Sequence, residues 1–342
     1  MSTSSAGKAL VVTGVCVAAL LGVAASFSRI CPRHFLPEQE LTAAVAAGDG
    51  CFLFLGDSRM AAGFQPGAMH AALAGLGNDR CLANLAIGAT DVSGAFLAAR
   101  TYLSRGVRPA MVVLGSVADF PLGPAAPLTP EEMVGNNAIH LIWSRADDVF
   151  AEVPGFWSGG IVPFDRGFRF LALRATPFGR YQSLFARKLQ TFDARLAGAT
   201  PAERNRFGAL DNMVSLEAHL RTGAVDRLAA ALRSPNERRV SPWFRALREL
   251  VGAAGIPFVV VELPMPSRFR QAVVETEVGR AYRQWLRSDL EAGGGALIDL
   301  SHPAWLSDQL FDDGLHLGAR GATKLSESLG LQLAALSKRP AP

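Results

Sequence analysis

The sequence predicts a parallel α/β protein, and three observations support this prediction. Short, nearly continuous apolar runs recur along the chain, as expected for strands that are covered on both faces. Stretches with helical periodicity lie between or after these runs, and this alternation is typical of a parallel sheet. With 342 residues, of which 49% are hydrophobic and 19% charged, the chain can bury a large core.

The expected elements follow in chain order. Strands are predicted at residues 51–55, 81–86, 110–114, 256–263 and 296–300. Helices are predicted at residues 94–104, 242–253, 273–290 and 319–336. Residues 121–240 interrupt the alternation with a proline-rich start and more Arg and Lys than Asp and Glu. This largely helical insertion is either a cap over the carboxyl edge of the sheet or a solvated excursion with arginines along its surface.

The N-terminus carries an uncharged, largely apolar segment at residues 9–27. Its length can span the roughly 30 Å hydrocarbon layer of a membrane as a helix. A cleaved signal peptide is the alternative, because small residues at 24–26 resemble a cleavage site. We favour an uncleaved anchor at residues 1–28, a linker with a short helix at 29–50 and an α/β domain at 51–342. The segment predicts an exported, membrane-anchored protein on the periplasmic or extracellular side.

The four cysteines offer a second indication of compartment. Cys51 and Cys81 each begin an apolar run, so neighbouring parallel strands would bring their sulfurs close together. An exported compartment would permit a disulfide between them. We nevertheless favour two buried free thiols, which are common in protein cores.

Charge and motif content restrict the partners. The net charge of +4 is mild and tolerates acidic partners such as anionic glycans or lipid head groups. The sequence lacks the concentrated basic-aromatic patch of a nucleic-acid-binding protein. Neither a metal-type cysteine pairing nor a dinucleotide-binding glycine loop is present. We therefore expect no cofactor, no metal and no nucleic acid.

Two separated motifs supply the parts of a nucleophilic acyl-transfer site. Gly56-Asp57-Ser58 ends the first expected strand, where a glycine allows a sharp turn that exposes the serine. Asp313-Gly314-Leu315-His316 precedes the last helix, and its i, i+3 spacing predicts one side of a helical turn. Ser58 is then the candidate nucleophile, His316 the base and Asp313 its orienting acid.

Alternatives remain open for the base and its carboxylate. Asp312 could orient His316 in place of Asp313. Asp299 and His302 form a competing pair, although they follow what looks like a strand end, where i, i+3 residues do not share a face.

Three further residues are candidates around the nucleophile. Gly88 follows the second strand and could bring its backbone N–H, with that of Ser58, to a developing oxyanion. Asn84 either touches substrate or braces this loop. Arg59 either meets an anionic substrate group or is a surface residue at a helix N-terminus.

These motifs resemble sequence blocks of the SGNH (GDSL) hydrolase superfamily. The resemblance lies in Gly56-Asp57-Ser58, in the Asn84-to-Gly88 loop and in Asp313-Gly314-Leu315-His316, and it covers roughly residues 50–120 and 255–337. It implies a flavodoxin-like three-layer α/β/α fold with a five-stranded parallel sheet. It also implies the catalytic roles of Ser58, His316 and Asp313, with the Ser58 and Gly88 amides as oxyanion donors.

The third block departs from the family pattern. That block normally supplies an asparagine that completes the oxyanion hole, and Val117 stands at this position in Leu114-Gly115-Ser116-Val117-Ala118-Asp119. Loss of one such donor costs about 10²–10³ in rate. Asn136 or Asn137 in the insertion could substitute.

The altered block, the N-terminal segment and the Leu263-Pro264-Met265-Pro266 turn resemble a subgroup of membrane-anchored proteins. These act in O-acetylation or D-alanylation of cell-surface polymers. The resemblance implies an esterase or O-acyltransferase for an acylated glycan or lipid of the cell envelope. An acyl-transporting membrane protein would be the partner of a transferase. The alternative is a catalytically degenerate protein that binds a glycan or serves as an assembly subunit.

Overall fold

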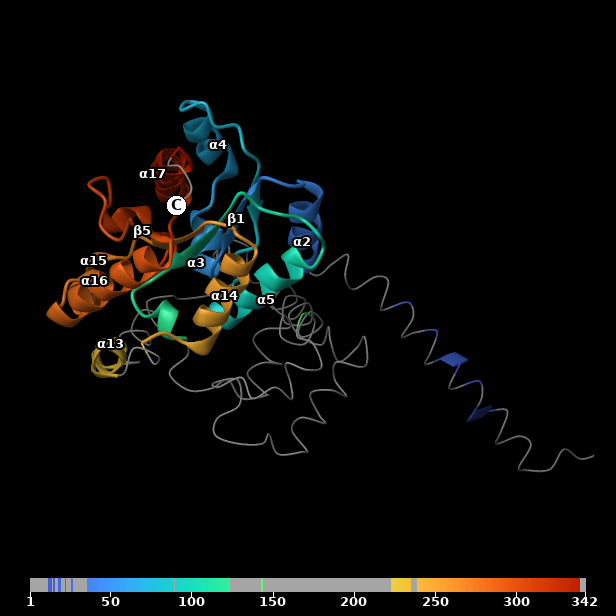
Figure 1. The fold of residues 1–342 in the computed structure, drawn as a ribbon, viewed down its shortest axis with the longest axis horizontal. Coiled ribbons are helices and arrows are strands. Elements are labelled where there is room, and N and C mark those ends of the chain that lie inside the picture. The colour runs from blue at the N-terminus through green and yellow to red at the C-terminus, as the bar shows by residue number, and fades with distance from the viewer. Residues whose placement is uncertain are drawn as a thin grey trace, which may run out of the picture.

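The computed structural model describes residues 36–88, 90–123, 223–234 and 239–338, together with Trp143 and single positions between 12 and 26. Its centre is one parallel sheet, which lies among the helices in Figure 1. The strand order is β2-β1-β3-β4-β5. The strands are β1 (Phe52–Leu55), β2 (Leu82–Asn84), β3 (Met111–Ser116), β4 (Phe258–Glu262) and β5 (Ala296–Asp299). All five predicted strands and the flavodoxin-like three-layer fold class are confirmed.

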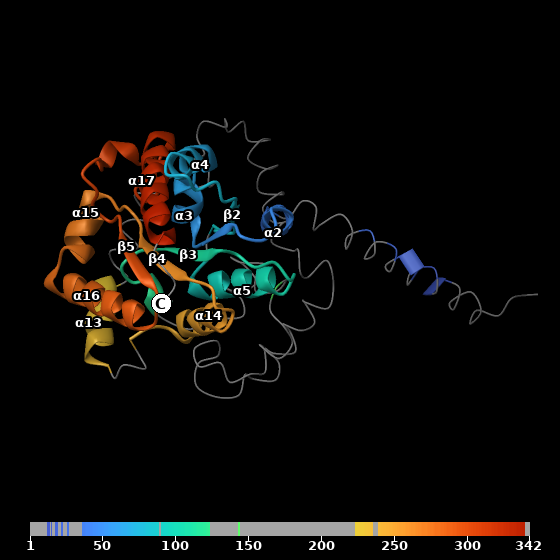
Figure 2. The ribbon, with the colours of Figure 1, turned by 45° about the horizontal axis from the view of Figure 1, so that its top comes forward.

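Helices cover both faces of the sheet (Figure 2). The helices of at least six residues are α2 (Leu36–Ala46), α3 (Ser58–Gly63), α4 (Pro66–Ala74), α5 (Val92–Leu103), α13 (Ala224–Arg233), α14 (Pro242–Ala253), α16 (Glu277–Ala292) and α17 (Ala319–Ser337). Short turns are η1 (Phe120–Leu122), α15 (Ser267–Phe269), η4 (Arg270–Val274) and η5 (Asp308–Leu310). In Figure 2, α3, α4 and α17 lie on one face, and α5, α14 and α16 lie on the other.

The core follows from the apolar runs. Every residue of β1, β3 and β4 is buried, because these strands have neighbours on both sides and helices on both faces. The edge strands β2 and β5 are only partly buried. Hydroxyl and carboxylate side chains cap the N-termini of several helices: Asp91 caps α5, Ser241 caps α14 and Thr276 caps α16.

One helix prediction needs correction. The helix expected at 273–290 is divided, because the Thr276 Oγ1 accepts a hydrogen bond from the Gly279 N–H and starts α16 anew after the π-turn η4. The short helix expected within residues 29–50 is present as α2, whose Leu41 and Ala44 are buried in the core. The hydrophobic core therefore includes residues that precede the first strand.

The preference for free thiols was wrong. Cys51 and Cys81 form a disulfide whose Cα atoms lie 4.4 Å apart. The register explains the contact: Phe52 pairs with Leu82, so the two preceding cysteines also lie side by side at the amino ends of β1 and β2.

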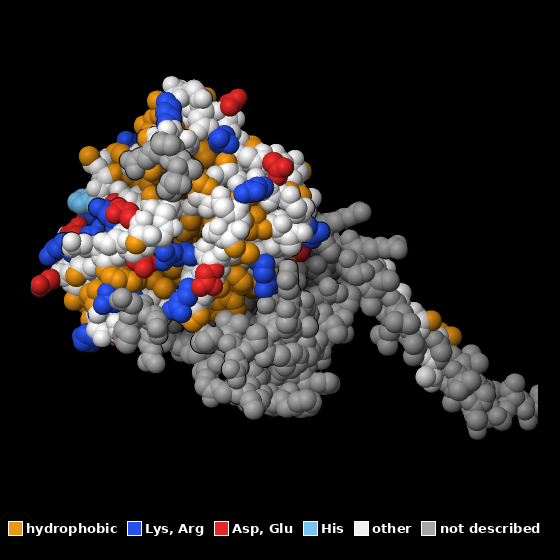
Figure 3. All heavy atoms as spheres, viewed as in Figure 1, with side chains coloured by type: hydrophobic (Ala, Val, Ile, Leu, Met, Phe, Trp, Pro, Cys, Tyr) orange, Lys and Arg blue, Asp and Glu red, His pale blue; other side chains and the backbone are white. Residues whose placement is uncertain are grey.

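Most of the predicted membrane segment and most of the insertion lie outside the described residues. Among the helices that are described, none is long and apolar enough to span a membrane. From the insertion, α13 packs against α16, and its Arg227 forms an ion pair with Asp119. On the face drawn in Figure 3, basic and acidic side chains of the described part are interspersed, in keeping with the mild net charge.

Candidate active site

The nucleophile turn is built by close contact between β1, β3 and α3. Gly56 follows β1 with a φ of 143°, and a Cβ there would lie 2.9 Å from both the Gly115 carbonyl oxygen and the Met60 Cβ. Only glycine fits this position without strain. Asp57 then caps α3, and Ser58 is the first residue of that helix. The turn presents Ser58 at the carboxyl edge of the sheet, where ligands bind in open α/β folds.

Ser58, His316 and Asp313 form a continuous hydrogen-bonded chain. The His316 Nε2 lies 2.8 Å from the Ser58 Oγ. On the other side of the ring, the His316 Nδ1 lies 2.9 Å from Asp313 Oδ2 and 3.1 Å from Oδ1. The side chains of His316 and Asp313 are 9% and 8% exposed. This arrangement can hold an imidazole with its Nε2 ready to accept the serine proton.

The loop that carries Asp313 and His316 is not the helical turn that we expected. It is an irregular turn closed by an antiparallel bridge between Phe311 and Leu317. Asp313 Oδ1 accepts hydrogen bonds from the backbone N–H groups of Leu315 and His316, at 2.8 and 2.7 Å. The carboxylate therefore orders the backbone of the loop and contacts the imidazole at the same time.

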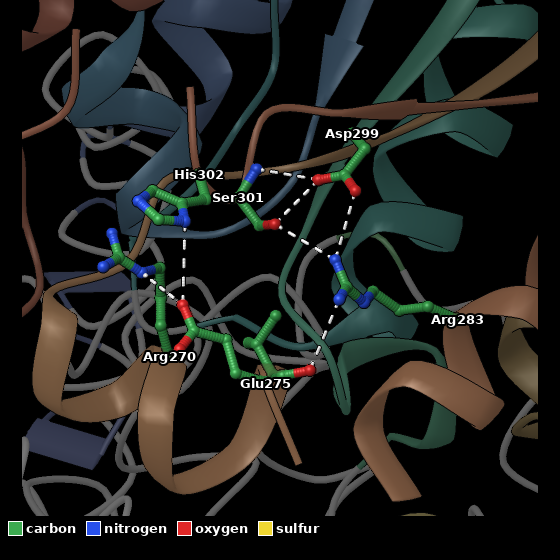
Figure 4. A pocket seen from close by; sticks show the side chains of 7 residues that line it. Arg270, Glu275, Arg283, Asp299, Ser301 and His302 are labelled. Carbon is green, nitrogen blue, oxygen red and sulfur yellow. Dashed lines mark hydrogen bonds and ion pairs between the residues drawn. The ribbon is translucent and has the colours of Figure 1, made fainter. Parts of the chain in front are cut away.

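The structure separates the two alternative carboxylates from this imidazole. Asp312 directs its carboxylate against Gly318, where a Cβ would clash with it. Asp299 accepts hydrogen bonds from Ser301 and pairs with Arg283. His302 instead lies beside Glu275, as Figure 4 shows.

Arg59 is not a surface residue: it forms an ion pair with Asp57, and its buried Nη1 has no hydrogen-bond partner among the described residues. Its Nε donates a 2.8 Å hydrogen bond to Asp57 Oδ2, its Nη2 contacts the same oxygen, and its backbone N–H donates to Oδ1 at 2.9 Å. Both side chains are only 10% exposed. Burial alone would raise the pKa of Asp57, but the charge and hydrogen bonds of Arg59 outweigh burial and hold it below the ordinary value. The charge of His316 contributes further to this lowering of the Asp57 pKa.

The loop after β2 lies against the nucleophile. The Ile87 N–H donates to the Gly56 carbonyl at 2.9 Å, and a Cβ at Gly88 would lie 3.7 Å from the Ser58 Cβ. Asn84 Oδ1 accepts the Ala86 N–H at 3.0 Å, so Asn84 braces this loop. Gly88 therefore lies next to Ser58, as expected. Asn84 forms a hydrogen bond within the loop, which is the bracing role that we considered for it.

Val117 provides no polar group at the end of β3. It is 1% exposed, and its carbonyl accepts a hydrogen bond from the Ser116 Oγ at 3.1 Å. Asn136 and Asn137, which we considered as substitutes, lie outside the described residues.

The Asp57–Arg59 pair was missed because the sequence analysis considered a substrate or surface role for Arg59 and none for Asp57. The i, i+2 spacing around Ser58 was the available signal, since an N-capping carboxylate lies close to the residue two positions later. The glycine at 115 was also missed as part of the site. A Cβ there would lie 2.8 Å from Met60, so it allows α3 to approach the sheet.

Comparisons with known proteins add little about activity. No protein-family model matches the sequence, and no curated protein matches it. Among solved structures, the chain is similar to a crystal structure from Bacteroides fragilis described as a "putative acylhydrolase". The identity is 11%, the TM-score is 0.35, and the match covers 87% of this chain and 95% of that chain. A likeness at this level says nothing about chemistry, and the function is inferred from the geometry of the site alone.

Proposed function

We propose that this protein is an SGNH-type serine acyl-transfer enzyme, an esterase or O-acyltransferase for an acylated glycan or lipid of the cell envelope. The single observation that carries the proposal is the chain from Ser58 Oγ through His316 to Asp313, with hydrogen bonds of 2.8 and 2.9 Å. Two distant motifs of the sequence bring these three polar side chains together in the order that nucleophilic catalysis requires.

The reaction has two steps. The Ser58 Oγ attacks the ester carbonyl carbon while His316 Nε2 takes the serine proton, and Asp313 stabilises the imidazolium. The tetrahedral intermediate then collapses, the ester C–O bond breaks, and the leaving alcohol takes the proton from Nε2. Water or a sugar hydroxyl next attacks the acyl-enzyme and loses its proton to His316, which returns it to Ser58.

Backbone N–H groups are the proposed oxyanion donors. Ser58 stands at the start of α3, and Gly88 lies against it across the nucleophile turn. The buried Val117 leaves the third donor position apolar. We infer that this protein hydrolyses esters about 10²–10³ times more slowly than an enzyme with all three oxyanion donors.

An exported, membrane-anchored location is part of the proposal. It is supported by the apolar segment at residues 9–27 and by the Cys51–Cys81 disulfide, since disulfides persist in oxidising compartments. An acyl-transporting membrane protein is the partner that transfer, as opposed to hydrolysis, would require.

Covalent labelling with a fluorophosphonate tests the mechanism directly. We expect one adduct on Ser58 by peptide mass spectrometry and none in Ser58→Ala. Asp313→Asn and His316→Gln should slow labelling by about 10³–10⁴, because each removes proton acceptance at Nε2. Ser288→Ala, which changes an exposed serine of α16, serves as the control with unchanged labelling.

Val117 favours one alternative, a catalytically degenerate protein that binds a glycan or joins an assembly. A folded wild-type chain that takes no label at Ser58 would support this alternative and contradict the acyl-transfer proposal. A stable complex that survives Ser58→Ala would further indicate an assembly role.

A further inference from the structure

A second polar pocket lies at the carboxyl edge of the sheet, beside β4 and β5. It has a volume of about 320 Å³, and its polar lining consists of Arg270, Glu275, Arg283, Asp299, Ser301 and His302 (Figure 4). Ser58 leaves β1 at the same edge, with β3 and β4 between β1 and β5. Because neighbouring strands lie about 4.8 Å apart, the pocket is on the order of 15 Å from the nucleophile.

One wall of the pocket is held together by its own hydrogen bonds, while the buried Arg283 Nε has no partner among the described residues. The Arg283 Nη1 donates to Asp299 Oδ2 at 3.1 Å and to Ser301 Oγ at 3.2 Å, and its Nη2 donates to the Val274 carbonyl at 3.3 Å. The Ser301 Oγ in turn donates to Asp299 Oδ1 at 2.7 Å. These bonds hold Arg283 and Asp299 in place, so this wall is preorganised.

The opposite side presents unused donors and acceptors. Arg270 is only 10% exposed, and its Nε donates to Glu275 Oε1 at 3.2 Å. Its two Nη atoms point away from Glu275 in Figure 4 and have no hydrogen-bond partner within the described part of the chain. His302 is 60% exposed at the rim, with Nδ1 3.7 Å from Glu275 Oε1. This side of the pocket therefore holds the N–H donors of Arg270 beside carboxylate and imidazole acceptors.

Charge balance decides the class of ligand. The cations Arg270 and Arg283 face the carboxylates of Glu275 and Asp299. Glu262 Oε2 lies 3.4 Å from the Arg283 Nη1, and Asp308 interacts with Arg270, so each arginine of the pocket is opposed by more than one carboxyl group. An anion would gain attraction to Arg270, lose a comparable amount to repulsion from Glu275, and give up its hydration. A neutral, hydroxyl-rich ligand can donate to the carboxylates and accept from Arg270 without this opposition.

We propose that this pocket is a subsite for a neutral sugar unit of a glycan chain whose acyl ester lies at Ser58. The assignment of the glycan as substrate rests on the proposed function, whereas sugar binding in the pocket does not require Ser58. The separation of the two sites means that an oligosaccharide can occupy both and a monosaccharide cannot.

Titration calorimetry on the full chain tests the subsite. The neutral probes are cellotetraose, maltotetraose and chitotetraose, and the anionic probes are glucuronate and inorganic phosphate. We expect saturable binding of at least one neutral tetrasaccharide and at least tenfold weaker binding of both anions. Arg270→Lys keeps the charge but loses the planar fork, and His302→Ala changes an exposed residue; each should weaken binding about tenfold.

Two control variants separate this inference from the catalytic proposal. Arg287→Gln removes an exposed charge on α16 outside the pocket and should bind the tetrasaccharide as the wild type does. Ser58→Ala should also retain binding, so an unreactive Ser58 with intact binding contradicts only the catalytic proposal. The subsite is wrong if no neutral probe binds, if an anion binds more tightly, or if Arg270→Lys and His302→Ala leave affinity unchanged.

Discussion

At the nucleophile, the side chains on either side of Ser58 form an almost fully buried ion pair. Asp57 caps α3 and receives the guanidinium of Arg59, and both are 10% exposed. The carboxylate also lies close enough to His316 for their charges to interact. Arg59 therefore neutralises a second carboxylate near the imidazole. Asp313 is the carboxylate that contacts Nδ1.

Removal of Arg59 should be strongly destabilising. Arg59→Ala leaves the Asp57 carboxylate buried without its counter-ion, and we expect the free energy of unfolding to fall by about 3–5 kcal/mol. Urea denaturation followed by circular dichroism measures this loss. Arg320→Ala, on the exposed side of α17, is the control and should change stability by less than about 0.5 kcal/mol. Equal losses for the two variants would contradict a buried pair.

Glu262 should make the stability of the protein depend on pH. Burial raises the pKa of this carboxyl to about 7, although Arg283 acts in the opposite direction. The folded state then binds a proton between about pH 4.5 and 7 that the unfolded state has released. The stabilisation is fully present below pH 4.5 and is lost as pH rises through 7, by roughly 3 kcal/mol at most.

Denaturation series across this pH range check the dependence. Glu262→Gln should flatten the decline in unfolding free energy, because glutamine does not titrate. Glu291→Gln, on the exposed side of α16, should leave the decline in place. An unchanged slope in Glu262→Gln would assign the pH dependence to other groups.

At the scale of elements, the site depends on how closely α3 approaches the sheet. Met60 of α3 packs where Gly56 and Gly115 lack side chains. Gly56 follows β1 and Gly115 lies within β3, the adjacent strand, so the two glycines are neighbours across the sheet. This contact places the start of α3, and with it Ser58, directly over the strand ends.

Gly56→Ala should disturb this contact. The substitution combines a φ of 143° with a Cβ 2.9 Å from the Gly115 carbonyl oxygen, so we expect a loss of at least about 2 kcal/mol in unfolding free energy. Fluorophosphonate labelling of the folded fraction should also slow. Gly252→Ala is the matched control: it lies in α14 with open space around it and should stabilise by about 0.5–1 kcal/mol. A Gly56→Ala protein as stable as wild type would contradict the packing argument.

For the whole molecule, the disulfide fastens the sheet at the edge opposite the site. Cys51 precedes β1 and Cys81 precedes β2, so the bond lies at the amino ends of these parallel strands. Ser58 and the Gly88 loop lie beyond the carboxyl ends of the same strands. The disulfide thus limits relative movement of the two strands that carry the proposed nucleophile and oxyanion donors.

Loss of this bond should lower global stability without directly altering the catalytic residues. A sequence separation of 30 residues corresponds to about 3–4 kcal/mol from the entropy of loop closure in the unfolded chain. We expect this decrease in Cys51→Ser/Cys81→Ser by thermal or urea denaturation. Thiol counting by mass spectrometry should find Cys51 and Cys81 blocked in the wild type before reduction. Reactive thiols at both positions would contradict the disulfide.

The sequence was sufficient to predict the strands and the residues of the proposed triad. Apolar runs identify strands that are buried on both faces, and Gly56-Asp57-Ser58 and Asp313-Gly314-Leu315-His316 have the residue types that a serine-based site needs. These features are local, because each depends on consecutive residues or on a short spacing. They also determined the parallel α/β fold class.

Only the tertiary structure decided which partners these residues have. The Asp57–Arg59 pair, the Cys51–Cys81 bond and the pocket around Arg270 depend on distances between side chains that a linear pattern does not contain. Asp313, and not Asp312, contacts His316 because the bridge between Phe311 and Leu317 shapes the loop. Hydrogen bonds and ion pairs act over a few ångströms, so their pairing is set by packing and strand register, which exist only once the chain is folded.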